Sequence, residues 1–122
     1  MTISDICERE NTGYIDKGRI SASADPYAAG GFNQRVSDDV PMDRDVPDTR
    51  LGACPHTDYE ADLPTTSVII TFHNELRSTL LRTIISVIRM TPENILKEIV
   101  LVDDNSTDPT IGMELIKIDV SS

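Results

Sequence analysis

Polar side chains that could bind a ligand stand at the ends of two apolar runs in the second half of the chain. The first run ends at Thr71 and His73, and the second ends at Asp103 and Asp104. Carboxylates accept hydrogen bonds from N–H or sugar hydroxyl groups of a ligand, and an imidazole can donate or accept one. Because open α/β sheets bind ligands at the carboxyl ends of neighbouring strands, these four residues predict half of a binding site.

The two runs predict a pair of parallel strands joined by a helix. They span residues 67–72 and 98–103, and they are continuous rather than alternating, which is typical of strands covered on both faces. Apolar residues recur at helical spacing between them, and Pro92 ends this pattern after about Met90. We expect Asn74 or Ser78 to cap the start of the helix. The expected apolar stripe consists of Leu76, Leu80, Leu81, Ile84, Val87 and Ile88.

Two alternatives to a binding site stay open at this point. The segment 103–106 could be a solvated turn whose Asp and Ser side chains serve the turn geometry. His73 stands near the expected start of the helix and could be a surface or capping residue. Asn105-Ser-Thr107 also forms a glycosylation sequon. We expect this sequon to stay unused, because a glycan there would obstruct the predicted crevice.

Residues 1–62 are polar and carry prolines or paired glycines every few residues, so they predict an arm without regular structure. This arm could be a disordered leader or an extended segment laid over another surface. In the second case, spaced apolar residues would anchor it. The expected anchors are Tyr14, Ile20, Tyr27, Phe32, Val36, Val40 and Val46.

The end of the sequence predicts an incomplete domain. Asp108 and Pro109 are typical of the start of a helix, and the sequence ends at Ser122, where a third strand is expected. A parallel sheet of two strands is marginally stable by itself. We therefore expect this chain to be a fragment that folds poorly alone.

Composition excludes several classes of function. The chain has 11 basic and 21 acidic residues and a net charge of −10, whereas nucleic acids are bound chiefly by Lys and Arg, so we expect no nucleic-acid partner. It has neither an apolar run of about 18 residues nor the basic and apolar segments of a signal peptide. Cys7 and Cys54 could be unrelated thiols or a disulfide, and they form no cluster typical of structural zinc.

Several motifs occur together and in order: Ser67-Val-Ile-Ile-Thr-Phe-His-Asn-Glu75, Glu98-Ile-Val-Leu-Val-Asp-Asp-Asn-Ser106, and, in the arm, Asp25-Pro-Tyr-Ala28, Phe32-Asn-Gln34, Met42-Asp-Arg44 and Val46-Pro-Asp-Thr-Arg50. They closely resemble the start of the catalytic domain of polypeptide N-acetylgalactosaminyltransferases and the segment before it. The two motifs that contain DPYA and FNQ are similar to the type-two-like subgroup. On this resemblance, residues 1–62 are an extended pre-catalytic arm. Residues 63–122 are the amino-terminal part of a nucleotide-sugar-binding domain with a GT-A, Rossmann-like fold.

The resemblance implies an enzyme that transfers N-acetylgalactosamine from UDP-GalNAc to Ser or Thr of acceptor proteins, with retention of configuration and with Mn²⁺. Such enzymes initiate mucin-type O-glycosylation in the Golgi lumen and are type II membrane proteins when full length. Carried over by position, Thr71 and His73 would line the uridine pocket, Asp104 would bind the uridine, and Asp103 would support it. Cys54 resembles a family cysteine that forms a disulfide with a partner far downstream.

Other parts that the resemblance calls for have no counterpart in this sequence. They are the DxH metal motif, a later metal-binding histidine, the acceptor-binding segment, the lectin domain, the membrane anchor and the partner of Cys54. We therefore expect this chain to lack the Mn²⁺ ligands, to carry only the uridine half of the site and to be inactive by itself. The alternative is a non-catalytic truncated product that acts as a binding or regulatory fragment.

Overall fold

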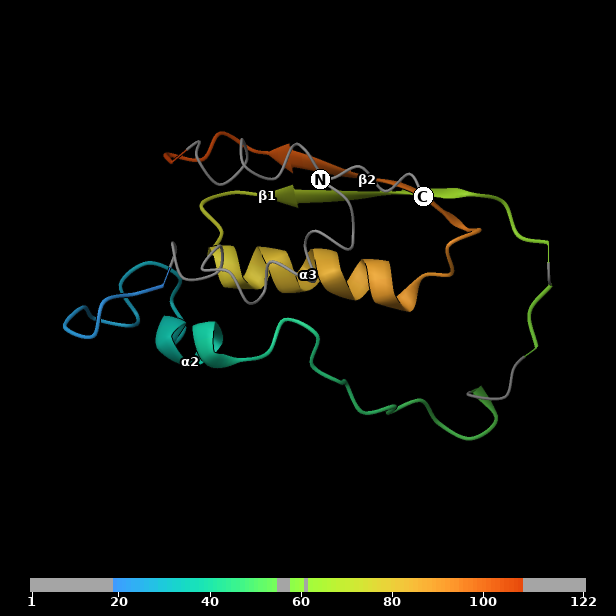
Figure 1. Cartoon of the computed structure of the whole chain (residues 1–122), viewed down its shortest axis with the longest axis horizontal. Coiled ribbons are helices and arrows are strands. Elements are labelled where there is room, and N and C mark those ends of the chain that lie inside the picture. Colours follow the sequence, from blue (N-terminus) through green and yellow to red (C-terminus); the bar gives the residue numbers. More distant parts are fainter. Residues whose placement is uncertain (1–18, 55–57, 61, 109–122) are drawn as a thin grey trace.

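The computed structural model describes residues 19–54, 58–60 and 62–108. Helix α2 spans Gln34–Asp39, strand β1 spans Thr66–Phe72, helix α3 spans Arg77–Met90 and strand β2 spans Leu96–Asp103. Figure 1 shows three layers, in which α3 lies between α2 and the two strands. The predicted strand–helix–strand unit is thereby confirmed. The predicted helix after Asp108 and the expected anchor Tyr14 lie outside the described residues.

Strands β1 and β2 pair in parallel, as predicted. The register pairs Ser67 with Glu98 and runs without interruption to Phe72 and Asp103, so both strands end at the same edge of the sheet. The strands begin at Thr66 and Leu96, slightly before the predicted positions. Within the described residues, no helix has the length and apolar character needed to cross a membrane.

The hydrophobic core lies between α3 and one face of the sheet. Leu80, Leu81 and Ile84 of the predicted stripe are buried, and Ile84 is fully buried, whereas Leu76 and Val87 are only half-buried. Ile85 was not predicted, yet it is buried as well. Each such side chain stabilises the fold by about 1.5–3 kcal/mol on burial. The cluster consists of Met42, Phe72, Leu80, Leu81, Ile84 and Ile85, with Ile70, Ile88, Ile99 and Leu101 packed against it.

The second face of the sheet corrects an expectation from the sequence. Ile69 is 66% exposed, and Val100 and Val102 are exposed too, so burial alternates along both strands. The continuous apolar runs predicted strands covered on both sides. Among the described residues, however, only α3 packs on the sheet, and the side chains on the opposite face lack a covering layer.

The start of α3 differs from the prediction as well. Its N-cap residue is Leu76, and no side chain caps it through a hydrogen bond. The amide of Asn74 is directed to Thr107 and His73, and the Ser78 hydroxyl is buried against Ser37. Both predicted caps were therefore wrong, because each polar group has a partner in another element.

The arm contains a helix that the sequence did not predict. Helix α2 begins after Asn33, whose side chain accepts a hydrogen bond from the Val36 amide at 3.2 Å, as N-cap residues do. Gln34, Ser37 and Met42 are the buried residues of this segment. Most of the apolar residues predicted as anchors are exposed, while Ile20 and Val40 are half-buried. The exposed ones are Tyr27, Phe32, Val36 and Val46.

Polar contacts attach this segment to α3. The Ser37 and Ser78 hydroxyls lie 3.0 Å apart in a buried position, and the Arg82 guanidinium donates to the Ser37 carbonyl at 2.6 Å and to its hydroxyl. Arg89, farther along α3, forms an ion pair with Asp43 at 3.0 Å. The sequence predicts apolar anchors for the arm. The described arm is attached to α3 by these polar contacts and by the buried side chain of Met42.

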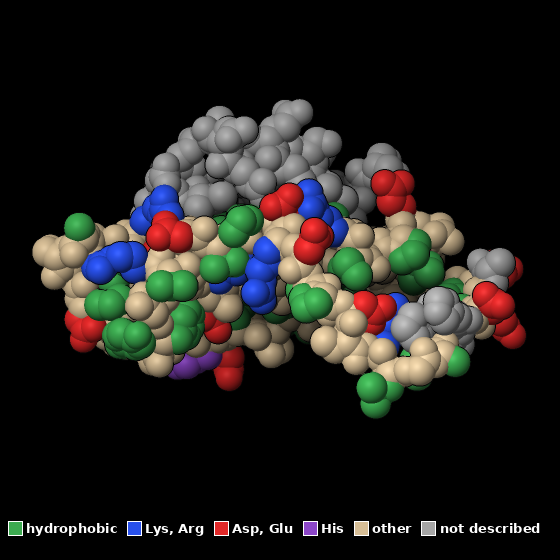
Figure 2. Space-filling view, turned by 90° about the horizontal axis from the view of Figure 1, so that it is seen from below, with side chains coloured by type: hydrophobic (Ala, Val, Ile, Leu, Met, Phe, Trp, Pro, Cys, Tyr) green, Lys and Arg blue, Asp and Glu red, His purple; other side chains and the backbone are tan. Residues whose placement is uncertain are grey.

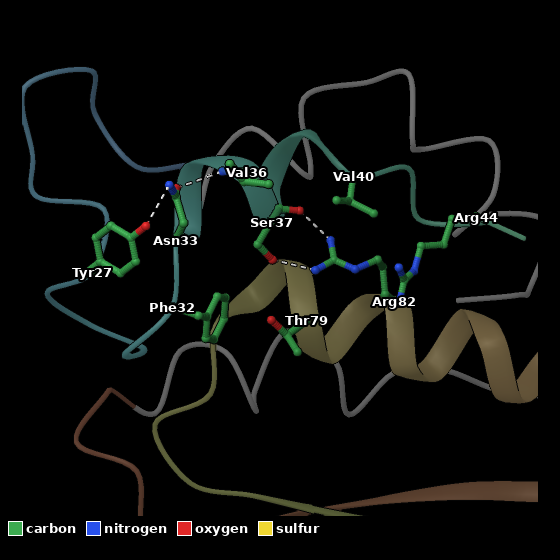
Figure 3. A pocket seen from close by; sticks show the side chains of 9 residues that line it. All are labelled: Tyr27, Phe32, Asn33, Val36, Ser37, Val40, Arg44, Thr79 and Arg82. Atoms are coloured by element: carbon green, nitrogen blue, oxygen red, sulfur yellow. Dashed lines mark hydrogen bonds between the residues drawn. The ribbon is translucent and has the colours of Figure 1, made fainter. Parts of the chain in front are cut away.

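An open groove of about 630 Å³ lies between α2 and the side of α3. Figure 3 shows Arg82 reaching toward Ser37 on one side of this groove, with Tyr27 and Phe32 on the other. Figure 2 views the molecule from the α2 side and shows hydrophobic side chains scattered among charged ones over this face.

Candidate functional site

The carboxyl ends of β1 and β2 are held in line beyond the last paired residues. The Asp104 amide donates to the Phe72 carbonyl at 2.8 Å, which adds one more rung to the ladder. Side chains alternate between the faces of a sheet. Phe72 and its partner Asp103 therefore belong to the α3 side, whereas Thr71 and its partner Val102 belong to the opposite side.

His73 is fixed between the two strand ends. Its Nδ1 lies 2.7 Å from the Asp104 carbonyl oxygen, and its Nε2 lies 3.1 Å from the Asn74 side-chain nitrogen. A carbonyl only accepts and an amide nitrogen only donates, so these contacts assign the proton to Nδ1 of a neutral ring. His73 is exposed, yet neither ring nitrogen is left free for a ligand.

Asn74 connects the end of β1 to the loop that follows β2. Its backbone N–H donates to the Ser106 hydroxyl at 2.9 Å. Its side-chain oxygen accepts from the Thr107 amide at 2.8 Å and from the Thr107 hydroxyl at 3.0 Å. Its backbone φ of 48° lies in the left-handed region, which asparagine tolerates better than most residues.

The two adjacent aspartates have different environments. The Asp103 carboxylate accepts a hydrogen bond from the Ser106 amide at 2.9 Å. A hydrogen bond from the Ser106 hydroxyl, followed by the one from its amide, lowers the pKa of Asp103. Asp104 is exposed, and its carboxylate accepts no hydrogen bond from the described part of the chain. Asp104 is therefore the one of the pair whose whole carboxylate lacks a partner among the described residues, whereas one oxygen of Asp103 is bound to Ser106.

The structure places all four predicted residues at one edge of the sheet and brings two of them, His73 and Asp104, into contact. His73 and Asp104 are in direct contact, Thr71 lies two residues before His73, and Asp103 builds the turn. Sequence reasoning missed Asn74, Ser106 and Thr107, which form the network around them. Asn and Ser next to strand ends are typical of side chains that hydrogen-bond to the backbone, and this signal could have indicated their role.

The donor set at this edge does not fit a metal ion. Among the described residues, no group of three or more His, Cys, Asp or Glu side chains could hold one. Both nitrogens of His73 and one oxygen of Asp103 have partners within the protein. Cys54 is an exposed free thiol in the described part of the chain, and Cys7 lies outside that part.

Comparison with known proteins identifies the class to which this strand–helix–strand unit belongs. Residues 67–113 match the family described as Glycosyl transferase family 2. The structure is similar to a solved structure described as "Crystal structure of GalNAc-T7 with UDP, GalNAc and Mn2+", with a TM-score of 0.68 and 45% identity over 73% of this chain and 16% of that one. The fold is thus part of a glycosyltransferase fold, which confirms the predicted partial GT-A architecture.

The curated relatives specify the family further. The chain is 51% identical to human Polypeptide N-acetylgalactosaminyltransferase 16 over 105 residues, which make up 86% of this chain and 19% of that protein. It is 50% identical to human Polypeptide N-acetylgalactosaminyltransferase 14 over the same share of both chains. It is also 48% identical to Polypeptide N-acetylgalactosaminyltransferase 4 of Caenorhabditis elegans. This chain belongs to the polypeptide N-acetylgalactosaminyltransferase family, and it spans about a fifth of the length of the curated relatives that it matches.

Proposed function

We propose that this chain carries the uridine side of the donor site of an enzyme that transfers N-acetylgalactosamine from UDP-GalNAc to Ser or Thr of proteins, with retention of configuration. Thr71 and His73 line the pocket, Asp104 binds the uridine, and Asp103 supports the loop. The observation that carries the proposal is the contact between His73 Nδ1 and the Asp104 carbonyl at 2.7 Å. It joins residues from two strand ends at the edge where open α/β sheets bind nucleotides.

The chemistry of the edge agrees with a nucleoside rather than with a phosphate. The available Asp104 carboxylate suits the N–H of a uracil ring or the hydroxyls of a ribose, because a carboxylate only accepts hydrogen bonds. It would repel a diphosphate. No cationic side chain belongs to the network of residues 73, 74 and 103–107. The diphosphate therefore has to be held by groups other than those of this edge.

The proposal assigns no chemical step to this chain alone. Mn²⁺ is present in the structure of the relative GalNAc-T7, and in a whole transferase such an ion would neutralise the leaving diphosphate. The residues at this edge do not fit a metal ion, so the donor site is completed by other parts of the protein. We also propose, on the same resemblance, that the whole protein is a type II membrane protein of the Golgi lumen.

Calorimetric titration of the chain with UDP tests this proposal. We expect binding that does not require Mn²⁺, and we expect Asp104→Asn to weaken it about tenfold or more, since a hydrogen bond to a charged group contributes about 1.5–3 kcal/mol. Glu93→Gln is the matched control, because it removes one exposed carboxylate near the opposite end of β2. Equal affinity in Asp104→Asn and wild type would contradict the assignment. Binding only with Mn²⁺ would show that this chain does supply metal ligands.

A further inference from the structure

We propose that Asn74 is a positioning residue of the nucleotide site, which fixes the tautomer and orientation of His73 and the path of the loop 104–107. This inference rests on the proposed uridine site. It adds a residue that the family resemblance did not assign. Asn74 forms three hydrogen bonds to Ser106 and Thr107 in the loop after β2 and a fourth to its neighbour His73.

The orientation of the Asn74 amide is determined by its partners. The Thr107 amide and hydroxyl both donate to one atom of that group, which must therefore be the oxygen. The nitrogen is then directed to His73 Nε2 at 3.1 Å, and this ring nitrogen has to accept. The proton of the neutral ring consequently lies on Nδ1, where it is donated to the Asp104 carbonyl. The Asn74 amide thus determines the tautomer of His73.

This network contributes more to the arrangement of the site residues than to the stability of the fold. Its members are exposed or half-buried, and a hydrogen bond between neutral groups adds little to stability where water can replace either partner. The bonds hold His73, Asp104 and Thr107 in one arrangement before a ligand arrives. Such preorganisation lowers the entropy that binding costs. We therefore expect the loss of Asn74 to change nucleotide affinity more than it changes folding.

The network also restricts what His73 can do. Because both ring nitrogens have partners, a ligand meets the face or the carbon edge of the ring. His73 then serves as a wall of fixed orientation for the uracil, and it does not act as an acid or a base. This role depends on Asn74, since without the amide donor Nε2 loses its partner and the ring is free to turn toward solvent.

The chain offers a matched control for the backbone conformation. Asn105 has a φ of 60°, close to the 48° of Asn74. Asn105 follows β2 as Asn74 follows β1. In the described residues the side chain of Asn105 makes no hydrogen bond, whereas that of Asn74 makes three. Glycine adopts this left-handed conformation freely, so a change to glycine at either position keeps the backbone and removes the amide.

The test compares three variants with wild type by two measurements. Asn74→Gly removes the whole amide, Asn74→Asp keeps the acceptor for Thr107 but removes the donor to His73, and Asn105→Gly is the control. Nitrogen NMR of the histidine rings, assigned with His73→Gln, reports the tautomer of His73. Calorimetric titration with UDP reports the affinity. We expect wild type and Asn105→Gly to keep the proton on Nδ1, and both Asn74 variants to lose this preference and to bind UDP about five- to tenfold more weakly.

Three results would overturn the inference. The first is an unchanged His73 tautomer in both Asn74 variants, and the second is an unchanged UDP affinity in both. The third is an equal loss in Asn105→Gly, because the effect would then come from the loop and not from the Asn74 amide. If wild type binds no UDP, the proposed uridine site fails, and the NMR measurement alone decides whether Asn74 positions His73.

Discussion

The hydroxyl groups of Ser37 and Ser78 lie 3.0 Å apart in a buried contact between α2 and α3. Ser37 also accepts hydrogen bonds from Arg82 through its carbonyl and its hydroxyl. A buried hydroxyl without a partner is unfavourable, and within the described residues the Ser78 hydroxyl has Ser37 as its one partner, whereas the Ser37 hydroxyl also has Arg82. This pair attaches α2 to α3, the helix that packs on the sheet, so α2 is part of the folded unit.

Removal of one member of this pair should destabilise the chain. We expect Ser37→Ala to lower the free energy of unfolding by about 1–3 kcal/mol, because it leaves the Ser78 hydroxyl buried without a partner. Urea unfolding followed by circular dichroism measures this change. Ser86→Ala is the control: its hydroxyl is exposed and donates to the Thr83 carbonyl within the same helix, so the change should stay within about 0.5 kcal/mol.

The double variant Ser37→Ala with Ser78→Ala separates the pair from its surroundings. We expect it to be less destabilised than the sum of the two single variants, because no hydroxyl is then left without a partner. Additive losses would contradict a direct contact between the two side chains.

The core makes a second prediction about stability. Ile84 is fully buried between α3 and the sheet, so Ile84→Ala should cost about 2–5 kcal/mol through lost burial and the cavity that remains. Met90 belongs to the same helix but is 83% exposed, and Met90→Ala should change stability by about 0.5 kcal/mol or less. Urea unfolding of the two variants compares them directly. Similar losses in both would mean that α3 does not pack on the sheet as described.

The elements with strong periodicity could be predicted from the sequence. The apolar runs predict the strand ends at Phe72 and Asp103. The helical spacing of apolar residues, together with Pro92, predicts the helix that ends at Met90. The location of His73 and Asp104 at one edge follows from the parallel pairing. These features depend on local residue order and on one rule of sheet topology, and both are visible in a single sequence.

The remaining features depend on contacts between distant residues. Helix α2 has only six residues, and its buried members Gln34 and Ser37 are polar, so no apolar pattern indicates it. The sequence predicts Ser78 as a possible helix cap because serine is strongly preferred at that position. Its actual partner lies 41 residues away in the sequence. The Asn74 network escaped prediction for the same reason.

The sequon at Asn105 gives a prediction about modification. We expect no glycan on Asn105 after expression in a secretory host, because the Thr107 hydroxyl is bound to Asn74 and a glycan would obstruct the edge that carries His73 and Asp104. Mass spectrometry of the tryptic peptides measures the occupancy, and Asn105→Gln supplies the unmodified reference. A glycan on Asn105 of protein that still binds UDP would contradict the crevice.

The turn after β2 should respond to acid through Asp103. The hydrogen bond from the Ser106 hydroxyl, and then that from its amide, lowers the pKa of Asp103 below its usual value. Because the pKa is lower in the folded state, the ionised carboxylate stabilises the fold at pH values above its unfolded-state pKa of about 3.9. This contribution is lost as the pH falls through the folded-state pKa.

A carbon NMR titration of the Asp103 carboxyl group measures its pKa in the folded chain. We expect Ser106→Ala to raise the pKa of Asp103 toward the usual value, and Thr83→Ala, on the exposed side of α3, to leave it unchanged. A pKa of Asp103 that is the same with and without the Ser106 hydroxyl would show that this hydrogen bond does not form in solution.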